Sequence, residues 1–268
     1  MKNRLVLFFI FLFVFKLQSQ IKFCSWNLEN FGQSKSVETI GFIANTLKVY
    51  DIVAIQEVVA GYGGAQAVAL LADELNRKGA QWDYIISDPT SSSAYKTERY
   101  AFLWKTAKVK KIGRAWLEEK YHLEIDREPY YCTFEYDSKR FTLVNFHAIT
   151  KSKQPETEIK YFKFLPATYP NLNLVFVGDF NCPQSHSVFT PLKKMGYVPV
   201  FQNQKTSLKK ECTKGNCLAS EFDNIFYSPK VSVHRFGVIS FYDSFPTLKE
   251  ARTVSDHIPV WMEFSVVD

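Results

Sequence analysis

The segment 172–181 changes abruptly from an apolar run to polar side chains. It reads Leu-Asn-Leu-Val-Phe-Val-Gly-Asp-Phe-Asn, so Asp179 and Asn181 stand two residues apart at the end of a predicted strand. Because side chains alternate along a strand, we expect both to point to one side, while Gly178 permits a close approach to the backbone. Such oxygen ligands suit Mg²⁺ or a phosphate-bound water. A local Asx turn explains this segment equally well when it is taken alone.

Acids, amides and imidazoles recur at the ends of other predicted strands. They are Asn27 and Glu57 after the first two strands, His147 at the end of a later one, Asp223 near the start of the predicted strand 222–227, and Asp256 with His257 before the last strand. Any one of these is common in a soluble protein, but the ensemble predicts one shared site. A Ser-His-Asp hydrolase built on residues 255–257 is excluded, because three adjacent residues cannot form a triad and the Gly-x-Ser-x-Gly turn is missing.

The hydrophobic pattern also predicts the elements that position these residues. Strand-like runs occupy 21–26, 52–55, 82–86, 100–104, 130–136, 141–146, 172–177, 222–227, 231–238 and 258–264, and helical periodicity is confined to 37–49, 64–78, 156–164 and 187–194. Many strands with few helices between them predict an α+β sandwich, in which mostly antiparallel sheets pack together under outer helices. No linker or repeat interrupts the chain, so residues 21–268 are expected to form a single domain.

Residues 1–20 have the pattern of a secretory signal peptide. A basic start is followed by the apolar run 5–15 and by a small residue, Ser19, where cleavage is expected. The run is shorter than the roughly 20 residues that a membrane-spanning helix needs. We therefore expect a secreted or periplasmic protein with no membrane anchor after cleavage.

Charge and cysteine content narrow the partners and the redox state. The net charge is +6, and removing the signal peptide with its three cations leaves +3, which permits a polyanionic partner without requiring one. Five cysteines allow two disulfides at most. Cys212 and Cys217 bracket a short polar loop and are the preferred pair, whereas Cys24 and Cys132 lie in apolar runs typical of buried thiols.

The series of motifs resembles the endonuclease/exonuclease/phosphatase superfamily, and within it the deoxyribonuclease I branch. The superfamily resemblance rests, in chain order, on Trp26-Asn27, Gln56-Glu57, Asn145-Phe146-His147, Gly178-Asp179-Phe180-Asn181 and Ser255-Asp256-His257. The branch resemblance rests on segment 95–103 and on Arg127-Glu128-Pro129. It implies a four-layered α/β sandwich of two packed sheets flanked by helices, with a catalytic domain over 21–268.

The resemblance also implies a role for each acid and imidazole. Glu57, with Asn27 and Asp256 nearby, is expected to hold Mg²⁺, for which Mn²⁺ substitutes; Asp179 and Asn181 are expected to hold the phosphate, the attacking water or a second metal ion. His147 and His257 would flank the scissile phosphate as acid and base. Which histidine donates stays open, and we favour His257 as the base.

Four further residues complete the expected site. By resemblance, Glu98 orients His147 and Asp223 orients His257, a pairing that fixes the tautomer of each ring. Arg127 resembles a phosphate-contacting arginine, and Tyr95 resembles a tyrosine that lies against a sugar or base. Lys151, together with Lys153, follows the His147 strand and is a candidate contact to the phosphate backbone.

The implied activity is that of an exported Mg²⁺-dependent endonuclease. Its substrate would be DNA, double-stranded and cut with little sequence preference to leave 5′-phosphate and 3′-hydroxyl ends, by a monomer. The alternative is a phospholipid or phosphoinositide phosphodiesterase or phosphatase of the same superfamily. A third hypothesis is a non-enzymatic binding module that retained the fold. An intact set of acids and imidazoles argues against the third hypothesis.

Three departures limit what the resemblance implies. Val59 stands where vertebrate enzymes of the branch place an arginine that enters the minor groove, and Thr97 is an extra residue beside Tyr95. The segment 209–217 replaces a structural calcium loop and is poor in carboxylates, so structural Ca²⁺ is doubtful. A disulfide between Cys212 and Cys217 would stabilise that loop instead.

Overall fold

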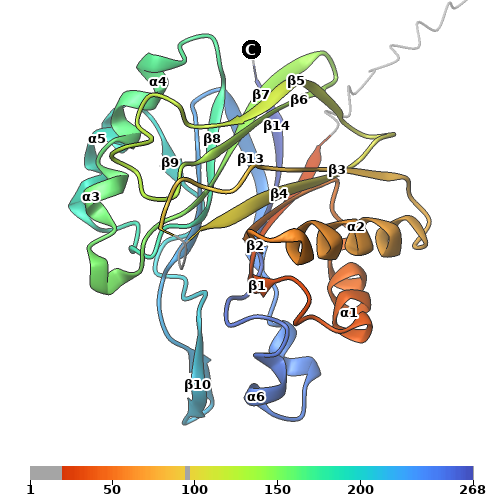
Figure 1. Cartoon of the computed structure of the whole chain (residues 1–268). Coiled ribbons are helices and arrows are strands. Elements are labelled where there is room, and N and C mark those ends of the chain that lie inside the picture. Colours follow the sequence, from red (N-terminus) through yellow and green to blue (C-terminus); the bar gives the residue numbers. More distant parts are fainter. Residues whose placement is uncertain (1–19, 94–96, 268) are drawn as a thin grey trace, which may run out of the picture.

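The computed structural model describes residues 20–93 and 97–267. Two six-stranded sheets face each other, and helices cover the outer face of each sheet (Figure 1). The predicted signal peptide at 1–20 lies almost wholly outside the described residues, and Tyr95 lies outside them as well. Within the described residues, no helix is long and apolar enough to cross a membrane.

The first sheet carries the N-terminal and C-terminal strands side by side. Its order is β13 (Val231–Val238), β14 (Val260–Val266), β1 (Ile21–Phe31), β2 (Ile52–Val59), β4 (Glu98–Lys105) and β3 (Trp82–Ile86). Only β1 and β2 pair in parallel, and their connection is α1 (Val37–Leu47), which starts where the Ser36 side chain accepts a hydrogen bond from the amide of Thr39. The helix α2 (Tyr62–Asn76) packs beside α1 on the same outer face.

The second sheet repeats this plan with shorter covering helices. Its order is β5 (Lys110–Leu117), β6 (Tyr130–Tyr136), β7 (Lys139–His147), β8 (Leu174–Asp179), β12 (Asp223–Tyr227) and β9 (Val198–Pro199), and here only β7 and β8 are parallel. The outer layer consists of η1 (Lys151–Lys153), α3 (Glu156–Ile159), η2 (Phe162–Phe164), α4 (Leu165–Thr168), η3 (Ser187–Phe189) and α5 (Thr190–Lys194). The helix expected over 156–164 is thus broken into separate turns.

Three apolar layers hold the sandwich together. Between the sheets, Phe141 of β7 meets Phe264 of β14 with ring centroids 5.2 Å apart, and both side chains are fully buried. One further cluster lies between the first sheet and α1 with α2, and another lies between the second sheet and α3 to α5. The predicted four-layered sandwich of two mostly antiparallel sheets is confirmed.

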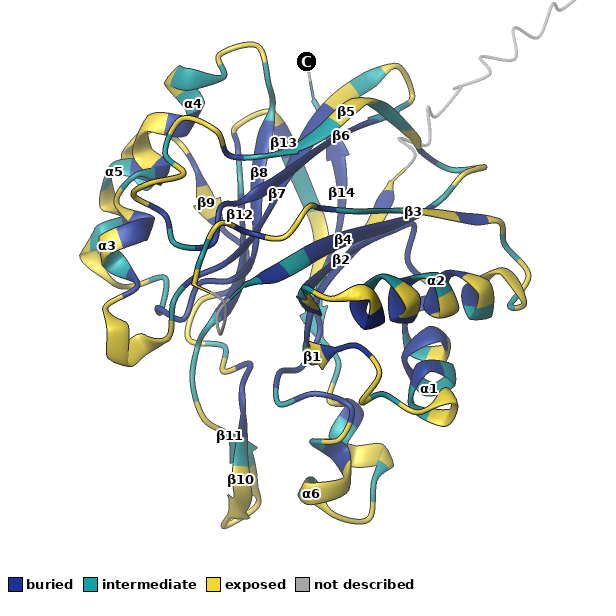
Figure 2. Ribbon diagram, in the orientation of Figure 1, coloured by how far each residue is buried: buried dark blue, intermediate teal, exposed yellow. Residues whose placement is uncertain are grey.

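Two small elements extend beyond the sandwich at one end. They are the hairpin of β10 (Leu208–Thr213) and β11 (Asn216–Leu218), and α6 (Leu248–Ala251), which follows η4 (Phe241–Ser244). Figure 2 shows that the hairpin tip and α6 are largely exposed. Both lie at the end of the sheets where the predicted site residues gather.

Candidate active site

The two parallel pairs bring the predicted site residues to one edge of the sandwich. In the first sheet Asn27 lies beside Gln56, and in the second His147 lies beside Asp179. The two sheets are joined beneath this edge, where the Gln56 amide donates a 2.6 Å hydrogen bond to Oδ1 of the buried Asn145. The carboxyl ends of four strands from two sheets therefore meet at one place.

A cleft of about 710 Å³ opens at this edge. The predicted residues that line it are Glu57, Glu98, Arg127, His147, Asp179, Asn181, Asp256 and His257. Asn27 and Asp223 are buried and contact this set by hydrogen bonds. Lys151 is exposed on η1, and it is Lys153 of the same turn that lines the cleft.

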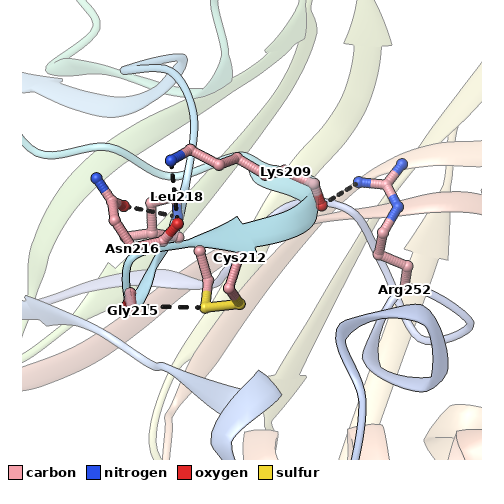
Figure 3. The surroundings of a disulfide bond; sticks show 7 residues. Lys209, Cys212, Gly215, Asn216, Leu218 and Arg252 are labelled. Atoms are coloured by element: carbon pink, nitrogen blue, oxygen red, sulfur yellow. Dashed lines mark hydrogen bonds between the residues drawn. A yellow bond between two sulfur atoms is a disulfide. The ribbon is translucent and has the colours of Figure 1, made fainter.

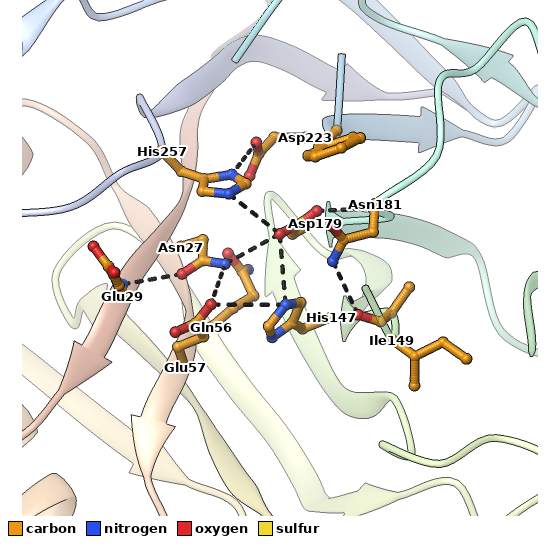
Figure 4. Close-up of polar contacts among 12 residues, drawn as sticks. Asn27, Glu29, Gln56, Glu57, His147, Ile149, Asp179, Asn181, Asp223 and His257 are labelled. Carbon is orange, nitrogen blue, oxygen red and sulfur yellow. Dashed lines mark hydrogen bonds and ion pairs between the residues drawn. The ribbon is translucent and has the colours of Figure 1, made fainter. Parts of the chain in front are cut away.

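Asp179 lies at the centre of the site (Figure 4). Its Oδ2 is 3.2 Å from Nδ2 of Asn27, 3.5 Å from Nε2 of His147 and 3.6 Å from Nε2 of His257. Its Oδ1 accepts a 2.8 Å hydrogen bond from the backbone amide of Asn181. One carboxylate thus forms the Asx turn and also faces both imidazoles, so the two interpretations of this segment are compatible.

The position of Asn181 corrects one step of the sequence argument. The strand β8 ends at Asp179, and Asn181 has a φ of 48°, so strand alternation does not direct its side chain. The turn does so instead, and Asn181 Nδ2 donates a 3.0 Å hydrogen bond to the carbonyl oxygen of Ala148. Close packing explains Gly178, since a Cβ there would lie 2.0 Å from the carbonyl oxygen of Phe146.

Glu57 is held on its two oxygens by different donors. Oε1 accepts from Nδ2 of Asn27 at 3.0 Å, and Oε2 accepts from the backbone amide of Asn30 at 3.0 Å. The Asn27 side-chain oxygen in turn accepts from the amide of Glu29 at 3.0 Å. In this arrangement the nitrogen of Asn27, rather than its oxygen, faces Glu57 and Asp179.

The oxygen donors of the cleft fit a hard divalent cation. Glu57, Asp179 and Asp256 present carboxylates to the same cavity, and such ligands suit Mg²⁺. Asp179, Asp223 and His257 also place potential ligand atoms within 4.8 Å of one another. However, Oδ2 of Asp223 contacts Nδ1 of His257 at 2.6 Å, so we assign these two residues to a hydrogen-bonded pair rather than to a metal site.

His147 is fixed by a buried carboxylate and a buried guanidinium. Its Nδ1 lies 2.9 Å from Oε1 of Glu98 and 2.9 Å from Nη1 of Arg127, which also donates to Oε2 of Glu98 at 2.8 Å. Burial raises the pKa of Glu98, but His147 and Arg127 outweigh it and hold that pKa below its usual value. Burial lowers the pKa of His147, and Glu98 reverses the sign, so the pKa is raised overall.

His257 has a matching partner on the other side of the cleft. Its Nδ1 faces Asp223 at 2.6 Å, and Asp223 also accepts a 2.6 Å hydrogen bond from the Thr206 hydroxyl. Burial lowers the pKa of His257, but the carboxylates of Asp223 and Asp179 raise it well above its ordinary value. Each imidazole thus uses Nδ1 for its own carboxylate and turns Nε2 toward Asp179.

Several cleft residues were not expected from the sequence. Phe222 stacks on the His257 ring at a centroid distance of 6.3 Å, and Lys210 and Arg252 line the cleft from the hairpin and from the end of α6. Phe222 precedes Asp223 directly, which is a signal that the sequence offered. Lys210 and Arg252 belong to segments without a hydrophobic pattern, so only the tertiary structure places them.

Comparison with known proteins agrees with this architecture and site. The model of the Endonuclease/Exonuclease/phosphatase family matches residues 24–257, and the chain belongs to this family, in its deoxyribonuclease I-like branch. It is 27% identical to human deoxyribonuclease gamma over 90% of this chain and 84% of the relative, and 26% identical to a deoxyribonuclease of Thioalkalivibrio over 92% and 71%.

Solved structures show the same fold. An endonuclease/exonuclease/phosphatase family protein from Bacteroides thetaiotaomicron superposes with a TM-score of 0.68 at 21% identity, covering 93% of this chain and 98% of that one. A mannosyl-6-phosphatase of the same organism gives 0.65 at 21% identity, covering 91% and 99%. The likeness to structures with such different names extends to the fold alone.

Proposed function

We propose that this chain is an exported, metal-dependent deoxyribonuclease that hydrolyses phosphodiester bonds. The observation that carries the proposal is the pair of imidazoles, each bound to its own carboxylate, whose Nε2 atoms lie 3.5 and 3.6 Å from one oxygen of Asp179. The deoxyribonucleases among its relatives support DNA as the substrate. The N-terminal pattern supports secretion or delivery to the periplasm.

In this proposal the acids of the cleft hold Mg²⁺, or Mn²⁺ in its place. Glu57, Asp179 and Asp256 would supply oxygens, and Asn27 would hold Glu57 and Asp179 in position through its two donated hydrogen bonds. A bound Mg²⁺ supplies positive charge next to the phosphate on which negative charge develops. Asn181, held against Ala148, would orient the phosphate or its water.

The two histidines would move the protons. Hydrolysis requires one group to take a proton from water and another to give one to the departing oxygen. The raised pKa of His257 favours its protonated form, and a cation held by Asp179 and Asp256 would lower that pKa and favour the neutral ring that a base needs. We retain His257 as the base and His147 as the acid on that condition.

Arg127 would place a fixed positive charge at the phosphate. Its Nη1 binds Glu98, its Nη2 donates to the carbonyl oxygen of Ala148, and its Nε is buried and has no hydrogen-bond partner among the described residues. Two of its three nitrogens are therefore committed to the protein. This arrangement supports a role as an electrostatic contact in preference to a free bidentate clamp.

The finer properties belong to the same proposal. The enzyme would be a monomer that cleaves double-stranded DNA with little sequence preference and leaves 5′-phosphate and 3′-hydroxyl ends. Tyr95 and Lys151, or its neighbour Lys153, would contact the DNA. Segment 209–217 would hold no structural Ca²⁺. Val59 lines the cleft beside Glu57 and carries no charge, which supports weak recognition of the DNA minor groove.

One assay tests the proposal against its alternative. The purified mature chain is incubated with supercoiled plasmid, and in parallel with sphingomyelin and with inositol phosphates, in Mg²⁺ or in EDTA. We expect Mg²⁺-dependent nicking of the plasmid, abolished by EDTA. Intact plasmid together with release of a lipid head group or of inorganic phosphate would refute it. His147→Ala and His257→Ala should each reduce the nicking rate at least about 10²-fold.

A further inference from the structure

The β10–β11 hairpin is a short, stiff projection next to the cleft. Its two-residue turn, Lys214 and Gly215, has φ values of 50° and 75°, which match the tight hairpin turn favoured by the twist of the strands. The Cys212–Cys217 disulfide crosses the hairpin just before this turn (Figure 3), which confirms the predicted pair. The disulfide and the tight turn thus fix the backbone from which the hairpin side chains project.

Arg252 joins the base of this hairpin to α6 and to the cleft. Its Nη1 donates a 3.0 Å hydrogen bond to the carbonyl oxygen of Leu208, the first residue of β10. Its Nη2 lies 3.4 Å from Oδ2 of Asp256 at the cleft wall. The hairpin and α6 are therefore held side by side at the mouth of the site, as Figure 1 also shows.

A groove of about 590 Å³ lies between the hairpin and α6. Its charged lining consists of Lys210 and Glu211 from the hairpin and Lys249 and Arg252 from α6 and its end. Lys210 and Arg252 also line the 710 Å³ cleft, so the groove continues the cleft outward. Because Arg252 is paired with Asp256, the charges left in the groove are Lys210 and Lys249 against Glu211, and this excess of positive charge attracts a polyanion.

The ammonium groups in the groove are available for a ligand. Lys209 is committed, because its Nζ donates to the carbonyl oxygen of Asn216 across the hairpin. Lys210 and Lys249, by contrast, make no side-chain hydrogen bond or ion pair with any part of the chain that the structure describes. Two unpaired ammonium groups on opposite walls of a groove that runs from a hydrolytic cleft favour phosphates as the occupant.

We propose that this groove binds the phosphate backbone of the DNA strand where it leaves the catalytic cleft, through Lys210 and Lys249. The inference rests on the proposed deoxyribonuclease function and adds a second contact region to it. Backbone contacts carry no sequence information, so the groove would contribute affinity and register rather than base selectivity. Each neutralised phosphate adds about 0.9 to the slope of log binding constant against log salt.

The test is charge reversal at the two free lysines, Lys210→Glu with Lys249→Glu. Binding of a fluorescent duplex of about 30 base pairs is followed by anisotropy in EDTA from about 50 to 200 mM salt, and KM and kcat for plasmid are measured in Mg²⁺. We expect the dissociation constant and KM to rise at least about 10-fold, the salt slope to fall by about 1.8, and kcat to change less than twofold.

The matched control is Lys194→Glu with Lys230→Glu, which reverses two exposed lysines away from the groove, at the end of α5 and next to the start of β13. It should leave the dissociation constant within twofold of the wild-type value and the salt slope within about 0.5 of the wild-type slope. Should the double groove variant fail to fold, Lys249→Gln alone is measured, with an expected loss of about 0.9 in slope.

The outcomes separate the groove from the proposed function. Unchanged affinity and slope in the groove variant, or equal losses in groove and control variants, would overturn the groove inference while the nuclease assignment stands. A fall in kcat without a change in affinity would also overturn it, because the substitutions would then act on the catalytic site. Wild-type protein that neither cuts nor binds DNA would overturn the proposed function and the groove with it.

Discussion

Replacement of Glu98 by glutamine isolates the electrostatic work of the Glu98–Arg127–His147 cluster. The substitution keeps the shape of the side chain and one hydrogen-bond acceptor but removes its negative charge. Glu98 and Arg127 expose only 9% of each side chain, and His147 exposes 6%. Solvent therefore screens little of the charge that the substitution leaves unpaired.

The expected destabilisation follows from that burial. Breaking a buried ion pair by removing one partner costs about 3 to 5 kcal/mol, because the remaining charge stays uncompensated. Glutamine can still accept a hydrogen bond from Arg127, and the pKa of His147 falls once Glu98 no longer raises it, which favours the neutral ring. We therefore expect Glu98→Gln to lose about 3 kcal/mol of unfolding free energy at pH 7.

The measurement is urea unfolding of wild type, Glu98→Gln, Arg127→Met and the double variant in EDTA. The double variant should lose clearly less than the sum of the two single losses, because it leaves no buried charge unpaired. The pKa of Glu98 is lowered on folding, so its contribution is present above its unfolded value of about 4.3 and is lost as the pH falls further. A loss below about 1 kcal/mol at pH 7, or additive losses in the double variant, would refute this reasoning.

Three other predictions address the backbone, the second imidazole and the hairpin. Gly178→Ala should lower the free energy of unfolding in urea by more than about 3 kcal/mol, since its Cβ would lie 2.0 Å from a backbone oxygen. The control, Gly113→Ala, is also at positive φ but in open space, and it should lower that free energy by about 1 to 2 kcal/mol. Equal losses in the two variants would contradict the packing argument. The raised pKa of His257 adds stability that is complete below about pH 6.5 and declines as pH rises through the folded-state pKa. In EDTA this decline should be seen in the wild type and be smaller in Asp223→Asn, in which only Asp179 and Asp256 still raise the pKa; identical pH profiles would exclude the Asp223–His257 pair as its cause. Replacing both Cys212 and Cys217 by serine should remove at most ~2 kcal/mol and speed amide exchange only in residues 208–218; exchange that is unchanged there would show that the disulfide does not order the hairpin.

The sequence predicted the bounds of some strands better than those of others. The strands at 82–86, 130–136 and 231–238 have the expected bounds, because aromatic and β-branched residues favour a strand even at the sheet edges, where 82–86 and 231–238 lie. The strand β5, at Lys110–Leu117, was not among the expected strands, because it begins with two lysines and none of its side chains is fully buried. The helix expected over 156–164 forms separate turns, because local packing of Phe162 and Leu165 on the sheet replaces regular periodicity.

The site could be predicted in part because strand ends are visible in sequence. Polar residues that follow directly on buried strands, such as His147 and Asp179, lie together in the structure. The side-chain orientation of Asn181 could not be predicted from strand ends, because a turn and a hydrogen bond to the carbonyl oxygen of Ala148 determine it. Lys210 and Arg252 could not be found either, because contacts between the hairpin and α6 place them and neither segment has a periodic pattern.

The same geometry explains why the catalytic centre and the outer groove can change independently. The centre is tied together from both sheets: Asn27 of the first donates to Asp179 of the second, and Glu57 of the first lies 3.7 Å from Nε2 of His147. The segment before β14 is fixed to it by Ser255, whose hydroxyl donates to the carbonyl oxygen of Asn27. A substitution here disturbs partners on several strands at once. The base of the hairpin is bound to this assembly through Arg252 and through the Leu208 amide, which donates to the carbonyl oxygen of Asp256. The side chains of Lys210 and Lys249 make no hydrogen bond or ion pair with the described residues of the centre, so new charges there should alter the contact with a polyanion without moving Asp179.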